Sequence, residues 1–156
     1  MNPTSSEIQF GKTHSQSAAV FDNPIIEMEP AFADARGGIQ PLVDEPMKSA
    51  VLISSKKGTV RANHFHKTDW HYCYVLSGKI DYYFRRVGSK EQAKRVMIKP
   101  GQLFFTPPMV DHAMVFAEDT TFLCLGRNSR EQTSYEADIE RIELVSPAQA
   151  AKDYPA

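Results

Sequence analysis

Short apolar segments separated by turn residues are the feature of this sequence that most restricts its fold. From about Ile25 onward, runs rich in β-branched and aromatic side chains alternate with Gly, Pro and Asp turn signals. The predicted strands are 47–54, 59–66, 71–76, 79–86, 95–99, 103–106, 112–117, 120–126 and 139–145. So many short strands predict an all-β domain, built as a double-sheet barrel or jelly roll that leaves few edges exposed.

The turns between these segments predict how neighbouring strands pair. Ser77 and Gly78 are expected to form a tight hairpin between 71–76 and 79–86, and the residues 118–119 a second one between 112–117 and 120–126. A four-residue turn, 67–70, would likewise join 59–66 to an adjacent antiparallel strand. Only one helix is expected, a short C-terminal one that Ser146 caps and Pro147 opens.

We expect one folded domain with two short extensions. Residues 1–22 are predicted to be a flexible or swapped arm, 23–145 the barrel domain, and 146–156 a short helix and tail. No stretch is apolar over the roughly 18 residues that a membrane span requires, and no secretion signal is evident, so the chain is expected in the cytoplasm. The formal net charge of −1, without blocks of like charge, gives no electrostatic drive for nucleic-acid binding.

Four of the five histidines fall where a barrel can bring them together. His64 and His66 are two residues apart on one predicted strand, so their imidazoles share a face. His71 opens the next strand, and His112 opens a later one. Neutral imidazole is the commonest metal ligand, and several of them suit a transition metal far better than Mg or Ca. The alternative is a cluster of imidazoles packed without metal.

The spacing around these histidines resembles the two motifs of the cupin superfamily. The first motif is matched by Gly58, His64, His66, His71 and Gly78. The second is matched by Gly101, Pro107 and His112. The resemblance implies an RmlC-like cupin jelly roll, also called a double-stranded β-helix. It also implies one divalent transition metal ion (Zn, Fe, Ni, Mn or Cu), held by His64, His66, His71 and His112.

One ligand position departs from the cupin pattern. Cupins usually have Glu where this chain has His71. Four neutral ligands would leave a divalent ion with its full charge, which favours anionic substrates such as a carboxylate, an enolate or a phosphate.

A second resemblance concerns the substrate. Residues 58–67 are similar to the Gly-x-x-Arg-Gly-x-His-x-His-Lys segment of cupin enzymes that isomerise or epimerise nucleotide-linked keto-sugars, and 34–37 and 135–141 are weaker echoes of the same enzymes. This implies an isomerase or epimerase of a keto-sugar nucleotide or a similar small anion, in a homodimer. In the 3,4-ketoisomerases of this group, the His-x-His pair moves protons without metal. A metal-dependent dioxygenase and a non-catalytic metal or small-molecule binding protein stay open as alternatives.

Further candidates would complete such a site. Tyr72 and Tyr82 are candidate proton shuttles, because a nearby cation lowers the pKa of tyrosine. Arg61 and Arg127 are candidate clamps for a diphosphate, although strand parity sets Arg61 opposite His64 unless a bulge intervenes. Asp111 is a candidate to orient the neighbouring imidazole, or else a turn residue. The expected inward-facing neighbours are Val60, Ala62, Cys73, Val75, Met114 and Phe116.

Overall fold

The computed structural model describes residues 18–156, so most of the arm expected at 1–22 lies outside the described residues. The strands of the first sheet, in spatial order, are β1 (Ile25–Ile26), β9 (Leu103–Thr106), β6 (His71–Ser77), β11 (Thr120–Gly126) and β4 (Ser49–Ser55). Those of the second sheet are β12 (Ile139–Arg141), β5 (Val60–His66), β10 (Val110–Phe116), β7 (Ile80–Arg86) and β8 (Lys94–Ile98). The other elements are the 3-10 helix η2 (Ala18–Phe21), the hairpin β2 (Phe32–Asp34) and β3 (Gly37–Ile39), and the helices α2 (Gln132–Asp138) and α3 (Pro147–Asp153).

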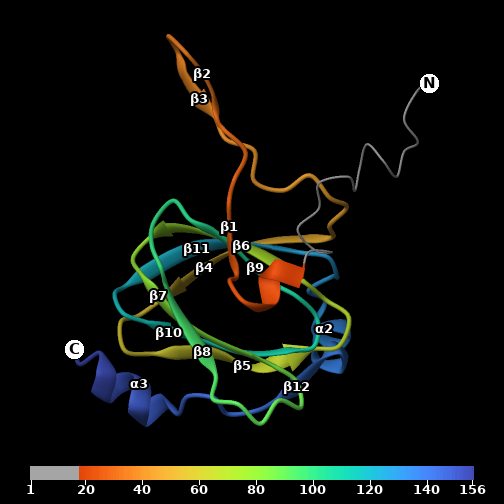
Figure 1. Ribbon diagram of the computed structural model, residues 1–156, viewed down its shortest axis with the longest axis vertical. Helices are drawn as coiled ribbons and strands as arrows, with labels where there is room; N and C mark the ends of the chain where they lie inside the picture. Colours follow the sequence, from red (N-terminus) through yellow and green to blue (C-terminus); the bar gives the residue numbers. More distant parts are fainter. Residues whose placement is uncertain (1–17) are drawn as a thin grey trace.

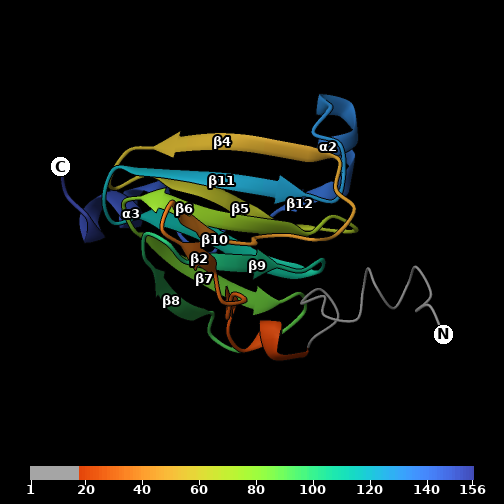
Figure 2. The ribbon, with the colours of Figure 1, turned by 90° about the horizontal axis from the view of Figure 1, so that it is seen from above.

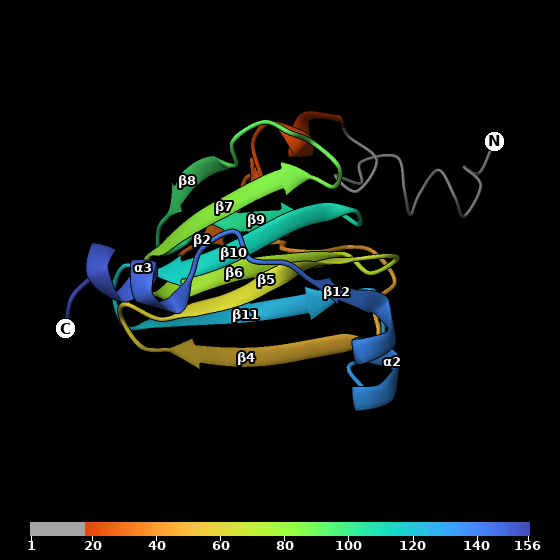
Figure 3. The same cartoon turned by 90° about the horizontal axis from the view of Figure 1, so that it is seen from below.

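The two sheets face each other across an apolar interior (Figure 2). Cys73, Val75 and Phe116 lie in the interior cluster and Met114 packs against it, as the strand parity predicted. The helices α2 and α3 lie at opposite ends of this body (Figure 3), and the β2–β3 hairpin projects away from it (Figure 1). The predicted all-β fold with a short C-terminal helix is confirmed, including the cap, since Ser146 Oγ accepts from the amide of Gln149.

The turns at 77–78 and 118–119 are corners between the sheets, and the prediction of two hairpins was wrong. β6 pairs with β9 and β11, whereas β7 pairs with β10 and β8. The two corners pack against each other: a Cβ on Gly78 would lie 2.3 Å from Thr120 Oγ1. A short turn of polar residues serves a hairpin and a corner equally well, so the turn sequence alone does not decide between them. The turn 67–70 is a corner too, because β5 and β6 belong to different sheets.

A helix interrupts the region expected to be loop and strand. The predicted strand 139–145 is shortened to β12, and α2 precedes it. The Glu131 carboxylate accepts from the amides of Ser134 and Thr133, at 2.9 and 3.0 Å, and these bonds lower the pKa of Glu131 to about 2. A helix of this length has too few turns to show a clear hydrophobic period. Among residues 18–156, no helix has the length and apolar character needed to cross a membrane.

A bulge in β5 sets the direction of its side chains. His64 pairs with His112 and Ala62 with Ala113, so Asn63 is the extra residue, and both Ala62 (φ 67°) and Asn63 (φ 52°) are left-handed. The Asn63 amide bonds the backbone of 144–145. The bulge turns Val60 to the outer face, where it packs near α3, so the expectation that Val60 lines the interior was wrong.

Relief of the left-handed strain at Ala62 should stabilise the fold. A left-handed L-residue costs about 1–2 kcal/mol, partly offset by the greater unfolded-state entropy of glycine. We therefore expect Ala62→Gly to raise the free energy of unfolding by up to about 1 kcal/mol in urea titrations. The matched control is Ala137→Gly in α2, which should lower it by about 0.5–1 kcal/mol. A loss of stability in both variants would contradict this account.

Candidate functional site

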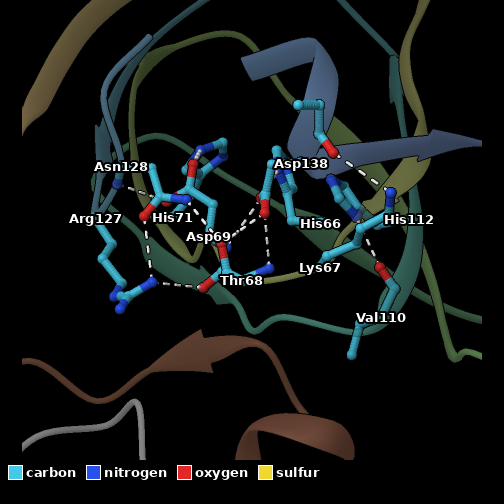
Figure 4. A network of polar contacts seen from close by, with 11 residues as sticks. His66, Lys67, Thr68, Asp69, His71, Val110, His112, Arg127, Asn128 and Asp138 are labelled. Atoms are coloured by element: carbon cyan, nitrogen blue, oxygen red, sulfur yellow. Dashed lines mark hydrogen bonds and ion pairs between the residues drawn. The ribbon is translucent and has the colours of Figure 1, made fainter. Parts of the chain in front are cut away.

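The four histidines gather at the end of the barrel covered by α2, and Figure 4 shows His66, His71 and His112 there. His64 and His66 lie on β5, His71 is the first residue of β6, and His112 lies on β10. All four are buried. The ring centroids of His64 and His66 are 4.8 Å apart, those of His64 and His112 4.9 Å, and those of His66 and His71 4.6 Å. The same-face prediction for His64 and His66 is therefore confirmed.

The ring nitrogens form two neighbouring groups. One ring nitrogen each from His64, His66 and His112 lie within 4.8 Å of one another. A second group of this kind joins His66 and His71 to a carboxylate oxygen of Asp69. The structure thus brings three of the four predicted ligands into one group and places His71 in the adjoining one.

His71 is held in an ion pair. Its Nε2 lies 2.8 Å from Asp69 Oδ2, and Asp69 Oδ1 accepts from the amide of Asn128. Gly126 makes room for the ring, because a Cβ there would lie 3.0 Å from His71 Cδ2. Burial alone would lower the pKa of His71, but Cys124 and Asp69 beside it raise that pKa to about 9. The proximity of Cys124 and the contact with Asp69 therefore favour the protonated form of His71.

The other three imidazoles are neutral. Burial, helped by the charges of neighbouring histidines, lowers the pKa of His64 to about 3 and of His66 to about 4, and holds the pKa of His112 well below its usual value. His112 Nδ1 donates to the carbonyl of Val110 at 3.0 Å, which leaves Nε2 with its lone pair.

Neither ring nitrogen of His66 has a hydrogen-bond partner. Its Nδ1 lies 3.4 Å from Asp138 Oδ2, close enough for electrostatic attraction but without the geometry of a hydrogen bond. A buried polar group without a partner costs about 1–3 kcal/mol. A ligand that bound these two nitrogens would therefore remove that cost.

The helix α2 covers the imidazoles, a role that the sequence did not predict for its residues. The ring of Tyr135 is centred 5.6 Å from His66 and 6.4 Å from His64, with the Arg130 guanidinium 4.7 Å from its own centre. The Asp138 carboxylate accepts from the amides of Thr68 and Asp69, which ties α2 to the turn that precedes His71 (Figure 4). In the sequence, only the weak similarity of residues 135–141 to the keto-sugar isomerases and epimerases pointed to this segment.

The two candidate tyrosines have different surroundings. Contrary to expectation, Tyr72 faces out of the barrel: it follows the inward-facing His71, packs with Trp70 and Phe105, and donates to Glu45 Oε1 at 2.6 Å. Tyr82 does face the interior, with its ring centre 6.1 Å from that of His112. Burial raises the pKa of Tyr82, the opposite of the shift expected for a proton shuttle.

The candidate arginines lie apart. Arg127 follows β11 at the histidine end and donates to the carbonyl of Thr68 at 3.2 Å. Arg61 is turned by the bulge but reaches across to β4, where Nε donates to Ser55 Oγ at 2.6 Å. Asp111 does not contact His112. Its Oδ2 accepts from Arg85, and the backbone carbonyl of Val110 orients the imidazole instead.

The opposite pKa shifts in the site predict a two-sided pH dependence of stability. The folded pKa values of His64, His66 and His112 lie below the unfolded value of 6.5, so the unfolded chain binds more protons and stability falls as pH drops from 6.5 through about 4. The contribution of His71 is complete below 6.5 and is lost as pH rises through about 9.

Urea unfolding in the presence of a chelator, from acid to mildly alkaline pH, measures both limbs. In His66→Asn, the decrease in the free energy of unfolding at acid pH should be smaller by on the order of 1–2 kcal/mol. Asp69→Asn should instead reduce the loss of stability at alkaline pH, because it removes the carboxylate that pairs with His71. Identical acid limbs for His66→Asn and the unsubstituted protein would refute the assignment.

Comparisons with known proteins agree with this fold. Residues 51–126 match the family model described as the cupin domain. No curated protein matches the chain in sequence. Three solved structures are similar over most of its length. The sugar 3,4-ketoisomerase QdtA from Thermoanaerobacterium thermosaccharolyticum, in complex with TDP, has a TM-score of 0.61 at 18% identity, covering 83% of this chain and 95% of that one.

A 3,4-ketoisomerase from Helicobacter canadensis has a TM-score of 0.61 at 16% identity, covering 85% of this chain and 96% of that one. The dTDP-4-dehydrorhamnose 3,5-epimerase from Sulfolobus tokodaii has a TM-score of 0.60 at 16% identity, covering 79% and 85%. At such identities the likeness establishes the fold. The chain therefore has the RmlC-like jelly-roll fold of these structures, and residues 51–126 are the part of it that matches the cupin domain.

Proposed function

We propose that this protein isomerises or epimerises a keto-sugar carried on a nucleotide. The observation that carries the proposal is the pair of buried, neutral imidazoles of His64 and His66, with both nitrogens of His66 free to exchange a proton. The similar structures include sugar ketoisomerases and an epimerase, which supports the same substrate class.

The chemistry required is the movement of one carbon-bound proton. His66 would take the proton from the carbon next to the ketone, leaving an enediolate. Return of a proton to the other face of that carbon gives the epimer, while return to the former carbonyl carbon, with the oxygens exchanging roles, gives the isomer. His64 lies close enough to His66, 4.8 Å between ring centres, for two imidazoles to share these transfers.

The electrostatics of the site suit an anionic substrate. Arg130 and Arg141 are close enough for their charges to lower the pKa of His64, although Arg141 is paired with Glu136. A diphosphate at the mouth would offset these charges and so raise the pKa of His64. We propose Arg130 and Arg127 as the diphosphate contacts.

Deuterium exchange tests the proposed reaction. Incubation with dTDP-4-keto-6-deoxyglucose in D₂O should label the carbon beside the ketone, and His66→Asn should slow the exchange by at least about 100-fold. Tyr83→Phe, on the outer face of the second sheet, is the control and should keep the normal rate. Absence of exchange in the unsubstituted protein across a panel of keto-sugar nucleotides would remove the proposal.

We propose as a second candidate that the imidazoles hold a metal ion. The three-histidine group fits one divalent transition metal ion (Zn, Fe, Ni, Mn or Cu), because its members are neutral, His112 presents Nε2, and Nε2 of His66 makes no hydrogen bond. When bound, such an ion would polarise a ketone oxygen as a Lewis acid. His71 is the weakest of the four predicted ligands, since Asp69 occupies its Nε2.

Metal titration separates a three-histidine from a four-histidine site. His112→Ala should weaken Zn²⁺ binding by at least about 100-fold, measured by calorimetry, whereas His71→Ala should change it by no more than about tenfold. Equal losses in the two variants would restore His71 as a ligand. Oxygen consumption by the metal-loaded protein would favour the dioxygenase alternative, and binding without turnover the non-catalytic one.

The homodimer expected from the sequence stays a prediction. We propose the β2–β3 hairpin as its contact surface, because all its residues are exposed, including Phe32 at 60% and Ile39 at 67%. An isolated two-stranded hairpin is marginally stable in water, so a partner surface would stabilise it.

A further inference from the structure

A second cavity lies at the end of the barrel opposite the histidines. It has a volume of about 570 Å³, within the usual range of small-molecule sites. Its lining comes from the last residues of β4 and β6 and the first residues of β5 and β11, whereas the imidazoles lie at the other ends of β5 and β6. The buried rings of Phe116 and Phe122, 6.0 Å apart, belong to the core cluster that fills the interior. A ligand in this cavity would therefore be separate from the imidazole site.

Arg61 supplies the cavity with an uncompensated charge. Its Nε donates to Ser55 Oγ at 2.6 Å and its Nη2 to the carbonyl of Ser54 at 3.0 Å, so neutral oxygens hold the guanidinium in place. Within residues 18–156, Nη1 makes no hydrogen bond and no carboxylate forms an ion pair with Arg61. Four other arginines of this region do pair with carboxylates, namely Arg36, Arg85, Arg95 and Arg141.

The remaining walls add a second cation and several hydroxyl groups. Lys56 Nζ lies 3.8 Å from Asp119 Oδ2, while Asp119 Oδ1 already accepts from the amide of Lys57. The charged lining residues are therefore two cations and one anion, a net charge of +1. The hydroxyls of Ser54 and Thr121 lie 3.4 Å apart, and Ser77 adds another hydroxyl to the lining.

We propose that this cavity is a second binding site, for a small phosphorylated polyol such as a sugar phosphate. The planar guanidinium of Arg61 matches phosphate geometry and is pre-positioned by Ser54 and Ser55. The hydroxyl-lined wall offers donors and acceptors to the hydroxyl groups of a sugar. The site stands on its own residues and does not depend on the reaction proposed for the imidazoles.

Nuclear magnetic resonance titration of the ¹⁵N-labelled full chain tests the site. Glucose 1-phosphate should give saturable shifts in the backbone amides of 54–61, 77 and 119–121, at about millimolar concentrations or below. Inorganic phosphate should shift the same amides more weakly, and glucose alone more weakly still. Shifts confined to 64–71, or no saturable shift, would overturn the proposal.

Variants identify the residues responsible. Arg61→Ala should weaken glucose 1-phosphate binding at least about tenfold. Arg61→Lys should weaken it by less, because lysine keeps the positive charge but lacks the planar guanidinium. Arg36→Ala, on the projecting hairpin, is the matched control and should bind normally. If Arg61→Ala does not fold, Ser77→Leu, at an exposed position of the cavity wall, should block binding by filling space.

His66→Asn separates this site from the imidazole site. It should leave glucose 1-phosphate binding unchanged, even if it abolishes proton exchange on keto-sugars. Loss of binding in His66→Asn would place the phosphate at the imidazoles, and full binding in Arg61→Ala would show that Arg61 does not hold it. Either result would refute the second site.

Discussion

The bulge at Ala62 and Asn63 is the constraint on which the arrangement of this jelly roll depends. It follows Val60 and Arg61 and precedes His64, so it changes which face each side chain of β5 occupies. His64 and His66 then point inward toward His112, while Val60 packs outside near α3. The same Asn63 fixes the backbone at 144–145. One irregularity in a strand therefore links the imidazole site, the opposite cavity and the packing of the C-terminal segment.

The histidines differ in charge although they share one end of the barrel. Cys124 and Asp69 favour the protonated form of His71, while burial favours the neutral form of His64, His66 and His112. Neutral imidazoles both accept protons and bind metal ions, so the same three residues support both candidate chemistries. The pair of Asp69 and His71 supplies a fixed local dipole at the edge of the group.

Much of this could be predicted from the sequence, where a local rule decides the outcome. The strands Leu103–Thr106 and Thr120–Gly126 have the predicted bounds, because hydrophobic runs ended by turn residues specify them. Period two placed His64 and His66 on one face. Three features depend on contacts between distant segments: which strands pair across the corners, the inward direction of Arg61, and the position of Tyr135 over His64 and His66. No local pattern encodes those contacts, and Tyr72 shows that one step along a strand moves a side chain to the other face.

The hydrogen bonds from Thr68 and Asp69 to Asp138 have a consequence for access to the imidazoles. They join α2 to the turn at 67–70, through the Asp138 carboxylate. The Asp69 carboxylate of the same turn pairs with His71. Displacement of α2 alone would break these hydrogen bonds, so we expect α2 and the turn at 67–70 to move together. The position of α2 over the imidazoles and the orientation of the His71 ring are therefore coupled. A substitution in α2 or in the turn at 67–70 should affect both.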